Sequence, residues 1–138
     1  MAIRHLTASP GRAMAMRILI AEDEPNIVLS LEFLLKEADY EVAVAREGAQ
    51  ALAQVAAFRP HLIVLDIMLP VINGFDLSRR IRDTPEFRDV KILMLTARGR
   101  QTEIERGFAA GADAYKTKPF ATRELVRLIA DLLADASK

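Results

Sequence analysis

Short apolar runs alternate with amphipathic segments along most of the chain. The first apolar run, 18–21, stops at three acidic residues, as a buried strand does at a polar edge. Pro25 then suits the first turn of a helix, whose apolar residues recur on one face until a turn near Asp39. The same alternation repeats along the rest of the chain. It predicts further strands at 42–45, 62–65, 92–95 and 112–116, and further helices at 49–58, 74–82, 101–110 and 122–134.

This series of strand–helix pairs predicts the fold class. Parallel neighbouring strands need right-handed crossover helices, so the chain should form an open sheet covered on both faces. The strand order could be Rossmann-like or flavodoxin-like, and five strands favour the second. We therefore expect an α/β protein, a (βα)5 flavodoxin-like doubly wound parallel five-stranded sheet with strand order 2-1-3-4-5. Residues 1–16 show no periodic pattern and are expected to form a flexible tail before a single domain at 17–138.

Composition limits the classes of function. The chain has 138 residues, of which 51% are apolar, so one domain can bury a core without a metal or a disulfide. Its 19 basic residues balance its 19 acidic ones, which argues against a general attraction to nucleic acid or anionic lipid. It has no cysteine, and no apolar run approaches the roughly 18 residues that cross a bilayer. We expect a cytoplasmic protein without a membrane segment.

Polar residues follow the ends of four predicted strands. Glu22 and Asp23 follow the first strand, Asp66 the third, Thr96 the fourth and Lys118 the fifth. The carboxyl ends of parallel strands share one edge of the sheet, where ligands bind in this class of fold. The first and third strands are neighbours in the favoured order, so their carboxylates should converge within about 5 Å. Each like-charged pair would then cost roughly 3 kcal/mol at an effective dielectric of 20.

A hard divalent cation would relieve this repulsion, and Mg²⁺ favours a few carboxylates with several retained waters. The same residues suit phosphoryl transfer, which needs positioning, charge neutralisation and an in-line nucleophile. Asp66 is the best nucleophile candidate because it ends the most apolar strand, and its product would be a labile acyl phosphate. Lys118 and Thr96 could donate hydrogen bonds to phosphoryl oxygens. Each residue alone is as well explained by a helix cap or a solvated side chain, so only the combination indicates a site.

Several neighbouring residues carry weaker signals. Lys118 precedes a proline, and an X-Pro bond in a tight turn can be cis, which is our hypothesis for this bond. Tyr115 could simply pack its ring against the sheet edge with the hydroxyl in water. His5 and His61 have no partner at metal-ligand or catalytic spacing, so both are assigned to the surface.

Five short motifs carry a resemblance to a known family. They are Ile-Leu-Ile-Ala-Glu-Asp-Glu-Pro at 18–25, Asp66 followed by Leu69-Pro70 and Gly74, Leu95-Thr96-Ala97, Gly111-Ala112-Asp113, and Lys118-Pro119-Phe120. Together they are highly specific, although each alone is weak. The segment 17–134 resembles the receiver domain of the two-component response regulators.

The resemblance implies a metal site beside a phosphoacceptor. Glu22 and Asp23 would form the acidic pair that holds Mg²⁺, with Asp23 favoured as the direct ligand. Asp66 would accept the phosphoryl group and contact the metal, and the backbone carbonyl of Met68 would complete the metal shell. Glu22 stands where an aspartate is commonest, although the family also uses glutamate there, and the function should survive this departure.

The resemblance also implies a conformational switch. Thr96 and Lys118 would bind phosphoryl oxygens, and Tyr115 would turn inward when Thr96 moves toward the phosphate. The surface that passes the signal on would consist of helix 101–110, strand 112–116 and helix 122–134.

We therefore expect a single-domain phosphorylation switch rather than an enzyme, with at most self-catalysed phosphotransfer and autodephosphorylation. A histidine kinase or a histidine phosphotransfer protein would charge Asp66 in a Mg²⁺-dependent reaction, and a downstream protein would dock on the signalling surface. The sequence ends at Lys138 with no output domain after the last predicted helix, so we expect no direct DNA binding. We also expect a monomer or a weak phosphorylation-dependent dimer.

Two other classes of function share part of this pattern. A phosphohydrolase of the haloacid dehalogenase type also forms an aspartyl phosphate, but it carries its nucleophile after the first strand, with a second aspartate two residues on. Here Asp66 follows the third strand, and Met68 stands at that second position. A flavodoxin-like flavin-binding module would need a hydroxyl- and glycine-rich loop after the first strand, where this chain has the acidic run 22–24.

Overall fold

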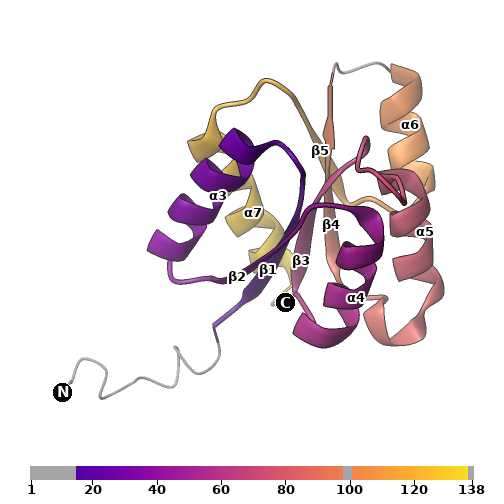
Figure 1. Ribbon diagram of the computed structural model, residues 1–138, viewed down its shortest axis with the longest axis horizontal. Helices are drawn as coiled ribbons and strands as arrows, with labels where there is room; N and C mark the ends of the chain where they lie inside the picture. Colours follow the sequence, from indigo (N-terminus) through magenta and orange to yellow (C-terminus); the bar gives the residue numbers. More distant parts are fainter. Residues whose placement is uncertain (1–14, 98–100, 137–138) are drawn as a thin grey trace.

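The computed structural model describes residues 15–97 and 101–136, and they form an α/β fold built on one parallel sheet (Figure 1). The strand order is β2-β1-β3-β4-β5, and every neighbouring pair is parallel. This order confirms the predicted flavodoxin-like arrangement. The strands are β1 (Arg17–Ala21), β2 (Glu41–Ala45), β3 (Leu62–Asp66), β4 (Lys91–Thr96) and β5 (Ala114–Thr117).

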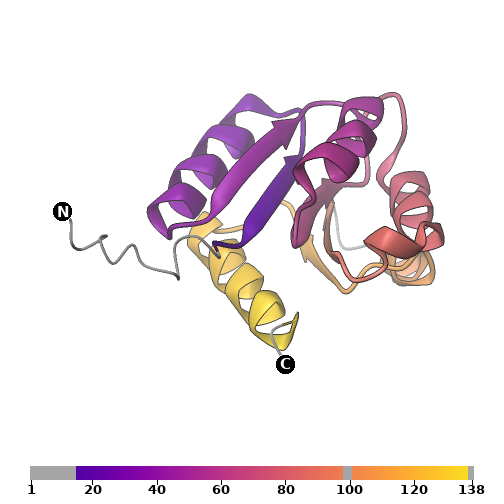
Figure 2. The same ribbon diagram turned by 90° about the horizontal axis from the view of Figure 1, so that it is seen from below.

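Helices cover both faces of the sheet (Figures 1 and 2). On one face lie α3 (Pro25–Glu37) and α7 (Thr122–Ala136). On the other lie α4 (Gly48–Phe58), α5 (Gly74–Asp83) and α6 (Gln101–Ala109), with a short 3₁₀ helix, η1 (Pro85–Phe87), after α5. Pro25 occupies the first turn of α3, where its missing N–H costs no hydrogen bond. The side chains of Glu47 and Asn73 cap the N-termini of α4 and α5.

Two apolar clusters hold the three layers together because successive residues of each strand point to opposite faces. Leu19 and Ile63 pack beneath α4 and α5, whereas Ile18 and Leu62 pack beneath α3 and α7. Every residue of β3 is buried, as expected for a central strand covered on both sides. The core therefore fixes the end of β3, where Asp66 lies, more firmly than it fixes the edge strands.

The fifth strand differs from its predicted range. It begins at Ala114 rather than at residue 112, because Asp113 pairs with Ile92 through its side chain as well as its backbone. The N–H of Asp113 donates to the Ile92 carbonyl, and the N–H of Ile92 donates to Asp113 Oδ2, both at 2.8 Å. Gly111, just before this contact, has φ of +104°, a conformation that glycine adopts without strain.

Most other predicted boundaries agree with the structure within one or two residues, but η1 was not predicted. The predicted tail, 1–16, lies outside the described residues except for its last two positions. Among the residues that are described, no helix is long and apolar enough to span a membrane.

Candidate functional site

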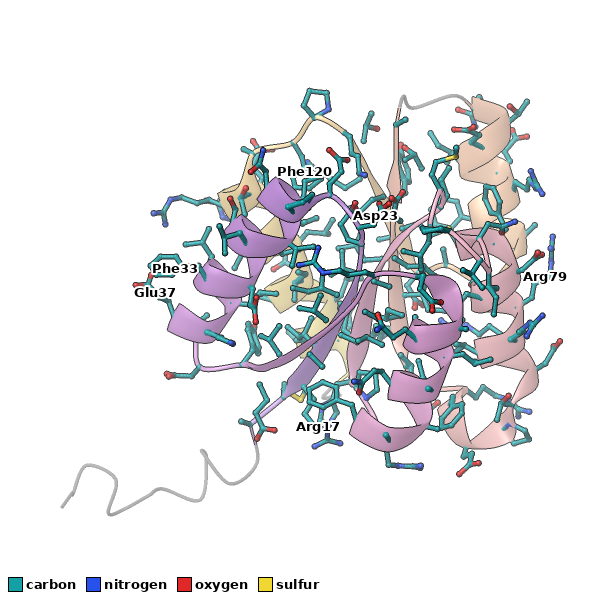
Figure 3. All side chains as sticks on the ribbon, in the orientation of Figure 1. Arg17, Asp23, Phe33, Glu37, Arg79 and Phe120 are labelled. Carbon is teal, nitrogen blue, oxygen red and sulfur yellow. The ribbon has the colours of Figure 1, made fainter. Side chains whose placement is uncertain are left out.

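Three carboxylates meet at the carboxyl ends of β1 and β3. Glu22 and Asp23 follow β1 directly and Asp66 ends β3, and one oxygen of each lies within 4.8 Å of the others. Glu22 and Asp66 are buried, whereas Asp23 is exposed. Figure 3 shows Asp23 at the end of the sheet opposite Arg17, the first residue of β1. The predicted convergence of these three residues is therefore present.

Glu22 is fully buried, with one carboxylate oxygen hydrogen-bonded and the other in an ion pair. Its Oε2 accepts a 3.0 Å hydrogen bond from the Glu24 N–H, and its Oε1 lies 3.0 Å from Lys118 Nζ. Burial raises the pKa of Glu22, and the neighbouring charge of Asp66 raises it further, against the opposing effects of the Glu24 N–H and Lys118. Keeping Glu22 ionised in this position therefore costs free energy even beside Lys118, and a further cation would offset this cost.

Asp66 is held in one orientation by two contacts. Its Oδ1 accepts a 3.0 Å hydrogen bond from the N–H of Met68, and its Oδ2 lies 3.4 Å from Lys118 Nζ. The turn after β3 thus uses one carboxylate oxygen, and the second faces the ammonium group. The Met68 side chain is exposed, and the proposed role of its backbone carbonyl remains a prediction.

Lys118 is shared by three carboxylates. Its Nζ lies 2.9 Å from Glu24 Oε1, 3.0 Å from Glu22 Oε1 and 3.4 Å from Asp66 Oδ2. Burial alone would lower the pKa of Lys118, but these carboxylates outweigh it and hold that pKa above its usual range. Its N–H donates to the Thr96 carbonyl at 2.7 Å, and the Lys118–Pro119 bond is cis, which confirms that hypothesis.

Glu24 is the one member of this group that the sequence reasoning did not assign to the site. The run of three acids had suggested a role for the first two only. A side chain one residue before Pro25 is equally suited to capping α3, and no such cap hydrogen bond forms here. No sequence signal distinguishes these two orientations, so the contact with Lys118 is visible only in the structure.

The two predicted switch residues lie on β4 and β5. Thr96 ends β4 and is buried, and within 15–97 and 101–136 its Oγ1 has no hydrogen-bond partner. Tyr115 lies on β5 with 39% of its surface exposed. Its ring packs edge-on against Phe108 of α6, with centroids 5.9 Å apart and an interplanar angle of 86°. Thr96 therefore offers a free buried donor, and Tyr115 faces outward.

The donor set suits a divalent cation. Three carboxylates within 4.8 Å supply hard oxygen ligands, and the exposed Asp23 leaves one side open to water. A cation there would offset the raised energy of the ionised Glu22. The residues present therefore fit a metal that keeps part of its hydration shell.

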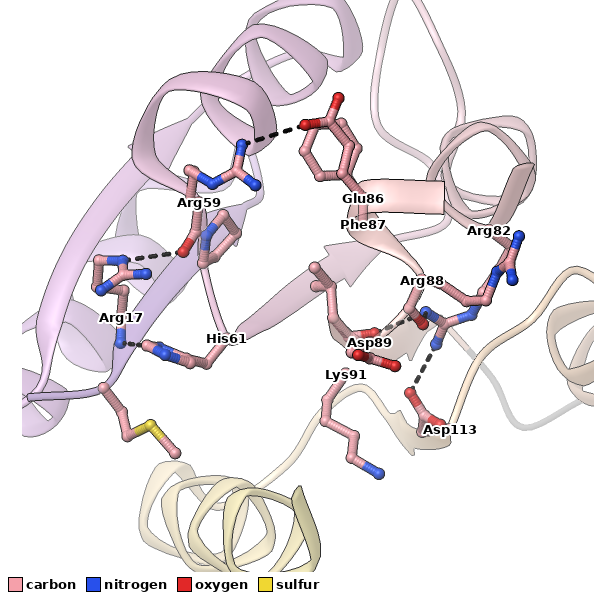
Figure 4. Close-up of a pocket in the computed structure, with 13 residues that line it drawn as sticks. Arg17, Arg59, His61, Arg82, Glu86, Phe87, Arg88, Asp89, Lys91 and Asp113 are labelled. Carbon is pink, nitrogen blue, oxygen red and sulfur yellow. Dashed lines mark hydrogen bonds and ion pairs between the residues drawn. The ribbon is translucent and has the colours of Figure 1, made fainter. Parts of the chain in front are cut away.

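A pocket lies at the opposite end of the sheet and is not part of this site (Figure 4). Four arginines line it, and Arg17 and Arg82 are engaged with backbone carbonyls, whereas Arg59 pairs with Glu86. Arg17 Nε donates to the carbonyls of Phe58 and Arg59, and Arg82 donates to the carbonyls of Arg88, Val90 and Gly111.

Comparison with known families decides what kind of domain carries this site. The family model for the response regulator receiver domain matches residues 18–130. This chain belongs to that family. The match spans every element from β1 to most of α7, and it includes all the residues that meet at the carboxyl ends of the strands.

Curated relatives and solved structures agree with the family assignment. The receiver is 39% identical over 123 residues to the phosphate regulon transcriptional regulatory protein PhoB of Rhizobium meliloti, covering 89% of this chain and 54% of that protein. It is 40% identical over 113 residues to the DNA-binding response regulator MtrA of Mycolicibacterium smegmatis, covering 82% and 48%. The chain therefore spans about half the length of these curated relatives.

Three solved structures have closely similar folds. A protein described as a response regulator from Chloroflexus aurantiacus J-10-fl superposes with a TM-score of 0.82 at 38% identity, covering 87% of this chain and 98% of that one. The receiver domain of the sensor histidine kinase PA1611 from Pseudomonas aeruginosa PAO1, described with a magnesium ion in its active-site cleft, gives 0.79 at 32%, covering 87% and 98%. A receiver domain of DrrB, described as BeF3-activated, gives 0.78 at 30%, covering 88% and 99%.

These relatives correct the predicted partners. We expected protein partners and no direct DNA binding, on the grounds of balanced charge and a sequence that ends after the receiver. The exclusion of DNA is wrong, because one relative is described as DNA-binding and another as a transcriptional regulatory protein. The matched region is only about half of each of them, so neither argument from this sequence excludes DNA as a partner.

Proposed function

We propose that this receiver is a phosphorylation switch in which Asp66 accepts a phosphoryl group from a phosphohistidine of a histidine kinase or a histidine phosphotransfer protein. The observation that carries the proposal is the placement of Asp66: buried at the end of the central strand, fixed through Oδ1, and flanked by two further carboxylates and Lys118. Transfer breaks the N–P bond of the donor and forms an O–P bond to Asp66. The donor imidazole keeps the electron pair and takes up a proton.

The ligand set proposed for Mg²⁺ is Glu22, Asp23, Asp66 and the Met68 carbonyl. When bound, Mg²⁺ supplies neutralisation of the charge on the phosphoryl oxygens. Glu22 and Asp66 are buried, so they would hold the ion inside the protein. Asp23 is exposed to water, and the phosphoryl donor would enter and leave on that side. The magnesium ion described in the active-site cleft of the PA1611 receiver supports a magnesium site in the present chain.

Lys118 and Thr96 are proposed to hold the transferred group. Lys118 donates to one phosphoryl oxygen from its present place beside Asp66 Oδ2. Thr96 Oγ1 is a buried hydroxyl without a partner in the part of the chain that the structure describes, so a phosphoryl oxygen would satisfy it. Movement of Thr96 toward that oxygen leaves room into which Tyr115 turns, and the surface of α6, β5 and α7 changes with it.

The first experiment is incubation with acetyl phosphate and Mg²⁺, followed by mass spectrometry of the intact protein. The wild type should gain about 80 Da, the mass of one phosphoryl group, and lose it again at alkaline pH because an acyl phosphate is labile. Asp66→Ala should show no gain. Asp131→Ala, which removes an exposed carboxylate on α7, should behave as the wild type. An absent gain in the wild type with Mg²⁺ present, or a gain that survives in Asp66→Ala, would contradict the proposal.

A further inference from the structure

Lys118 is closest to a residue that has no part in the proposed transfer. Its Nζ is 2.9 Å from Glu24 Oε1 but 3.4 Å from Asp66 Oδ2. The backbone of Glu24 is fixed, because its N–H donates to Glu22 Oε2 and the next residue begins α3. Its side chain nevertheless remains 58% exposed. The contact thus joins a buried site to a carboxylate on the surface.

An ammonium group has three protons, and Lys118 faces three carboxylates at rest. After transfer, the phosphoryl oxygens replace Asp66 Oδ2 among these acceptors and carry more negative charge than that oxygen, so they compete with Glu22 and Glu24 for the ammonium. Glu22 is fully buried, so water cannot take the place of the ammonium beside it. Glu24 is exposed, and water replaces the ammonium at little cost. The pair between Glu24 and Lys118 is the one that yields.

We propose that Glu24 is a positioning residue that retains Lys118 in the resting protein, and that this ion pair is released when Asp66 carries a phosphoryl group. The inference rests on the proposed function of Asp66. A contact present only in the resting form stabilises that form alone, so it weakens binding of a phosphoryl group or of its mimic by the same factor. Glu24 thereby sets how far the switch is charged at a given donor concentration.

The affinity for beryllium trifluoride, which mimics a phosphoryl group on a carboxylate, measures this effect at equilibrium. At saturating Mg²⁺, Glu24→Gln should bind the mimic about two- to fivefold more tightly than the wild type, the range expected for an exposed ion pair. Titration followed by ¹⁹F NMR gives both affinities directly. Glu37→Gln, the same substitution at an exposed position at the far end of the same helix, should leave the affinity unchanged.

Loss of a negative charge near the site could by itself favour an anion, and Glu24→Asp separates this from loss of the contact. The shorter side chain keeps the charge, but the fixed backbone holds its carboxylate about one methylene too far from Lys118. Tighter binding in both variants supports the proposal, because a long-range field would leave Glu24→Asp unchanged. The proposal is overturned by unchanged or weaker binding in Glu24→Gln, or by a wild-type affinity in Glu24→Asp.

The same binding measurements give a different result if Asp66 is not the phosphoacceptor. If the wild type binds no beryllium trifluoride at saturating Mg²⁺, or if Asp66→Ala binds it equally well, the phosphoacceptor role of Asp66 is wrong and the role of Glu24 falls with it. If the wild type binds and Asp66→Ala does not, while both Glu24 variants match the wild type, only the inference about Glu24 is wrong.

Discussion

The backbone N–H of Arg17 donates a 2.9 Å hydrogen bond to Nδ1 of His61, joining residues 44 positions apart at the start of β1 and just before β3 (Figure 4). His61 was assigned to the surface because it has no partner at metal-ligand or catalytic spacing, and in the structure it is partly exposed and accepts this bond. Burial lowers the pKa of His61, the charge of Arg17 lowers it further, and Glu41 opposes them in part. The bond needs an unprotonated Nδ1, so the fold favours neutral histidine.

Stability should therefore fall on mild acidification. A histidine in the unfolded chain titrates near pH 6.5, whereas His61 in the folded protein stays neutral to a lower pH. Below about pH 6.5 the unfolded state binds a proton that the folded state does not, so the free energy of unfolding decreases as pH falls toward the folded pKa. Above that range the histidine makes no pH-dependent contribution.

Urea unfolding at pH 7.5 and pH 5.5 checks this linkage. The wild type should lose more stability between the two values than His61→Gln, whose side chain does not titrate. Other groups that titrate in this range contribute equally to both proteins, so the difference between them isolates His61. Equal losses in the two proteins would contradict the linkage.

Arg82 makes four hydrogen bonds at the same end of the sheet as His61. Its Nε donates to the Gly111 carbonyl at 2.9 Å, and one terminal nitrogen donates to the carbonyls of Val90 at 2.7 Å and Arg88 at 2.9 Å. The other terminal nitrogen pairs with Asp113 Oδ2 at 2.8 Å. Only a guanidinium presents donors in this spread geometry. These bonds tie the end of α5 to the segments before β4 and β5.

Arg82→Ala should therefore destabilise the protein by about 2 kcal/mol, because three carbonyls, in two partly buried hydrogen bonds and one exposed one, lose a charged donor. Arg82→Lys should recover less than half of this loss, since one ammonium does not reach all four acceptors. Arg79→Ala is the matched control on the same helix, where an exposed 3.5 Å pair with Asp76 should contribute less than about 0.5 kcal/mol. Urea unfolding of the three variants measures their losses in free energy of unfolding. Equal losses for Arg79→Ala and Arg82→Ala would refute the expected order.

Sequence reasoning located the site because strand polarity is a strong constraint. The carboxyl ends of parallel strands must share an edge of the sheet. The sequence therefore predicts that Asp66 and Thr96, which end β3 and β4, lie at the same edge. The alternation of strands and helices likewise predicted a sheet covered on both faces. These inferences depend on backbone geometry, which the apolar pattern largely determines.

Side-chain choices among equivalent partners could not be predicted in the same way. Glu24 had either the N-terminus of α3 or Lys118 within reach, and the sequence gives no preference between them. The predicted start of β5 was wrong for a related reason. The carboxylate of Asp113 accepts the hydrogen bond from the N–H of Ile92 in place of a backbone carbonyl. Both outcomes depend on side-chain hydrogen bonds, which hydrophobic periodicity does not report.

The acidic site should reduce stability when no metal is present. The pKa of Glu22 is raised, chiefly by burial and further by Asp66, so its ionised form is less favourable in the folded protein than in the unfolded chain. At pH 7 this costs stability, and the cost disappears as pH falls through the raised pKa of Glu22 toward its unfolded value. Glu22→Gln should therefore raise the thermal midpoint in metal-free buffer at pH 7.

Thermal unfolding with and without Mg²⁺ tests both parts of this expectation. The gain of Glu22→Gln over the wild type should shrink as pH falls and vanish below the unfolded pKa of glutamate, where the carboxyl is protonated in both states. Added Mg²⁺ should stabilise the wild type more than the variant, because the cation binds the folded state and gains a charged ligand only in the wild type. A Glu22→Gln protein that is less stable than the wild type at pH 7 without metal would show that the contact with Lys118 outweighs burial.

Thr96 and Ser78 are both buried, but their hydroxyls differ in hydrogen bonding. Ser78 Oγ donates to the Ala110 carbonyl at 2.7 Å, whereas Thr96 Oγ1 has no partner among the residues that the structure describes. Ser78→Ala should cost about 1 kcal/mol, since it leaves a buried carbonyl without its donor. Thr96→Val keeps the shape and removes only an unsatisfied hydroxyl, so it should leave stability unchanged or slightly higher.

The same Thr96→Val protein should fail as a switch. With beryllium trifluoride and Mg²⁺, the wild-type Tyr115 ring resonances should shift as Tyr115 leaves its edge-on contact with Phe108 and turns inward. Thr96→Val offers no hydroxyl to the bound group, so the mimic should bind more weakly and the Tyr115 resonances should stay in place even at saturation. NMR of the tyrosine ring in both proteins measures this, with Thr96→Ser as the variant that restores the hydroxyl. If Thr96→Val shows the full wild-type shift, the hydroxyl does not couple the phosphoryl site to β5, and the orphan donor at the end of β4 has another role.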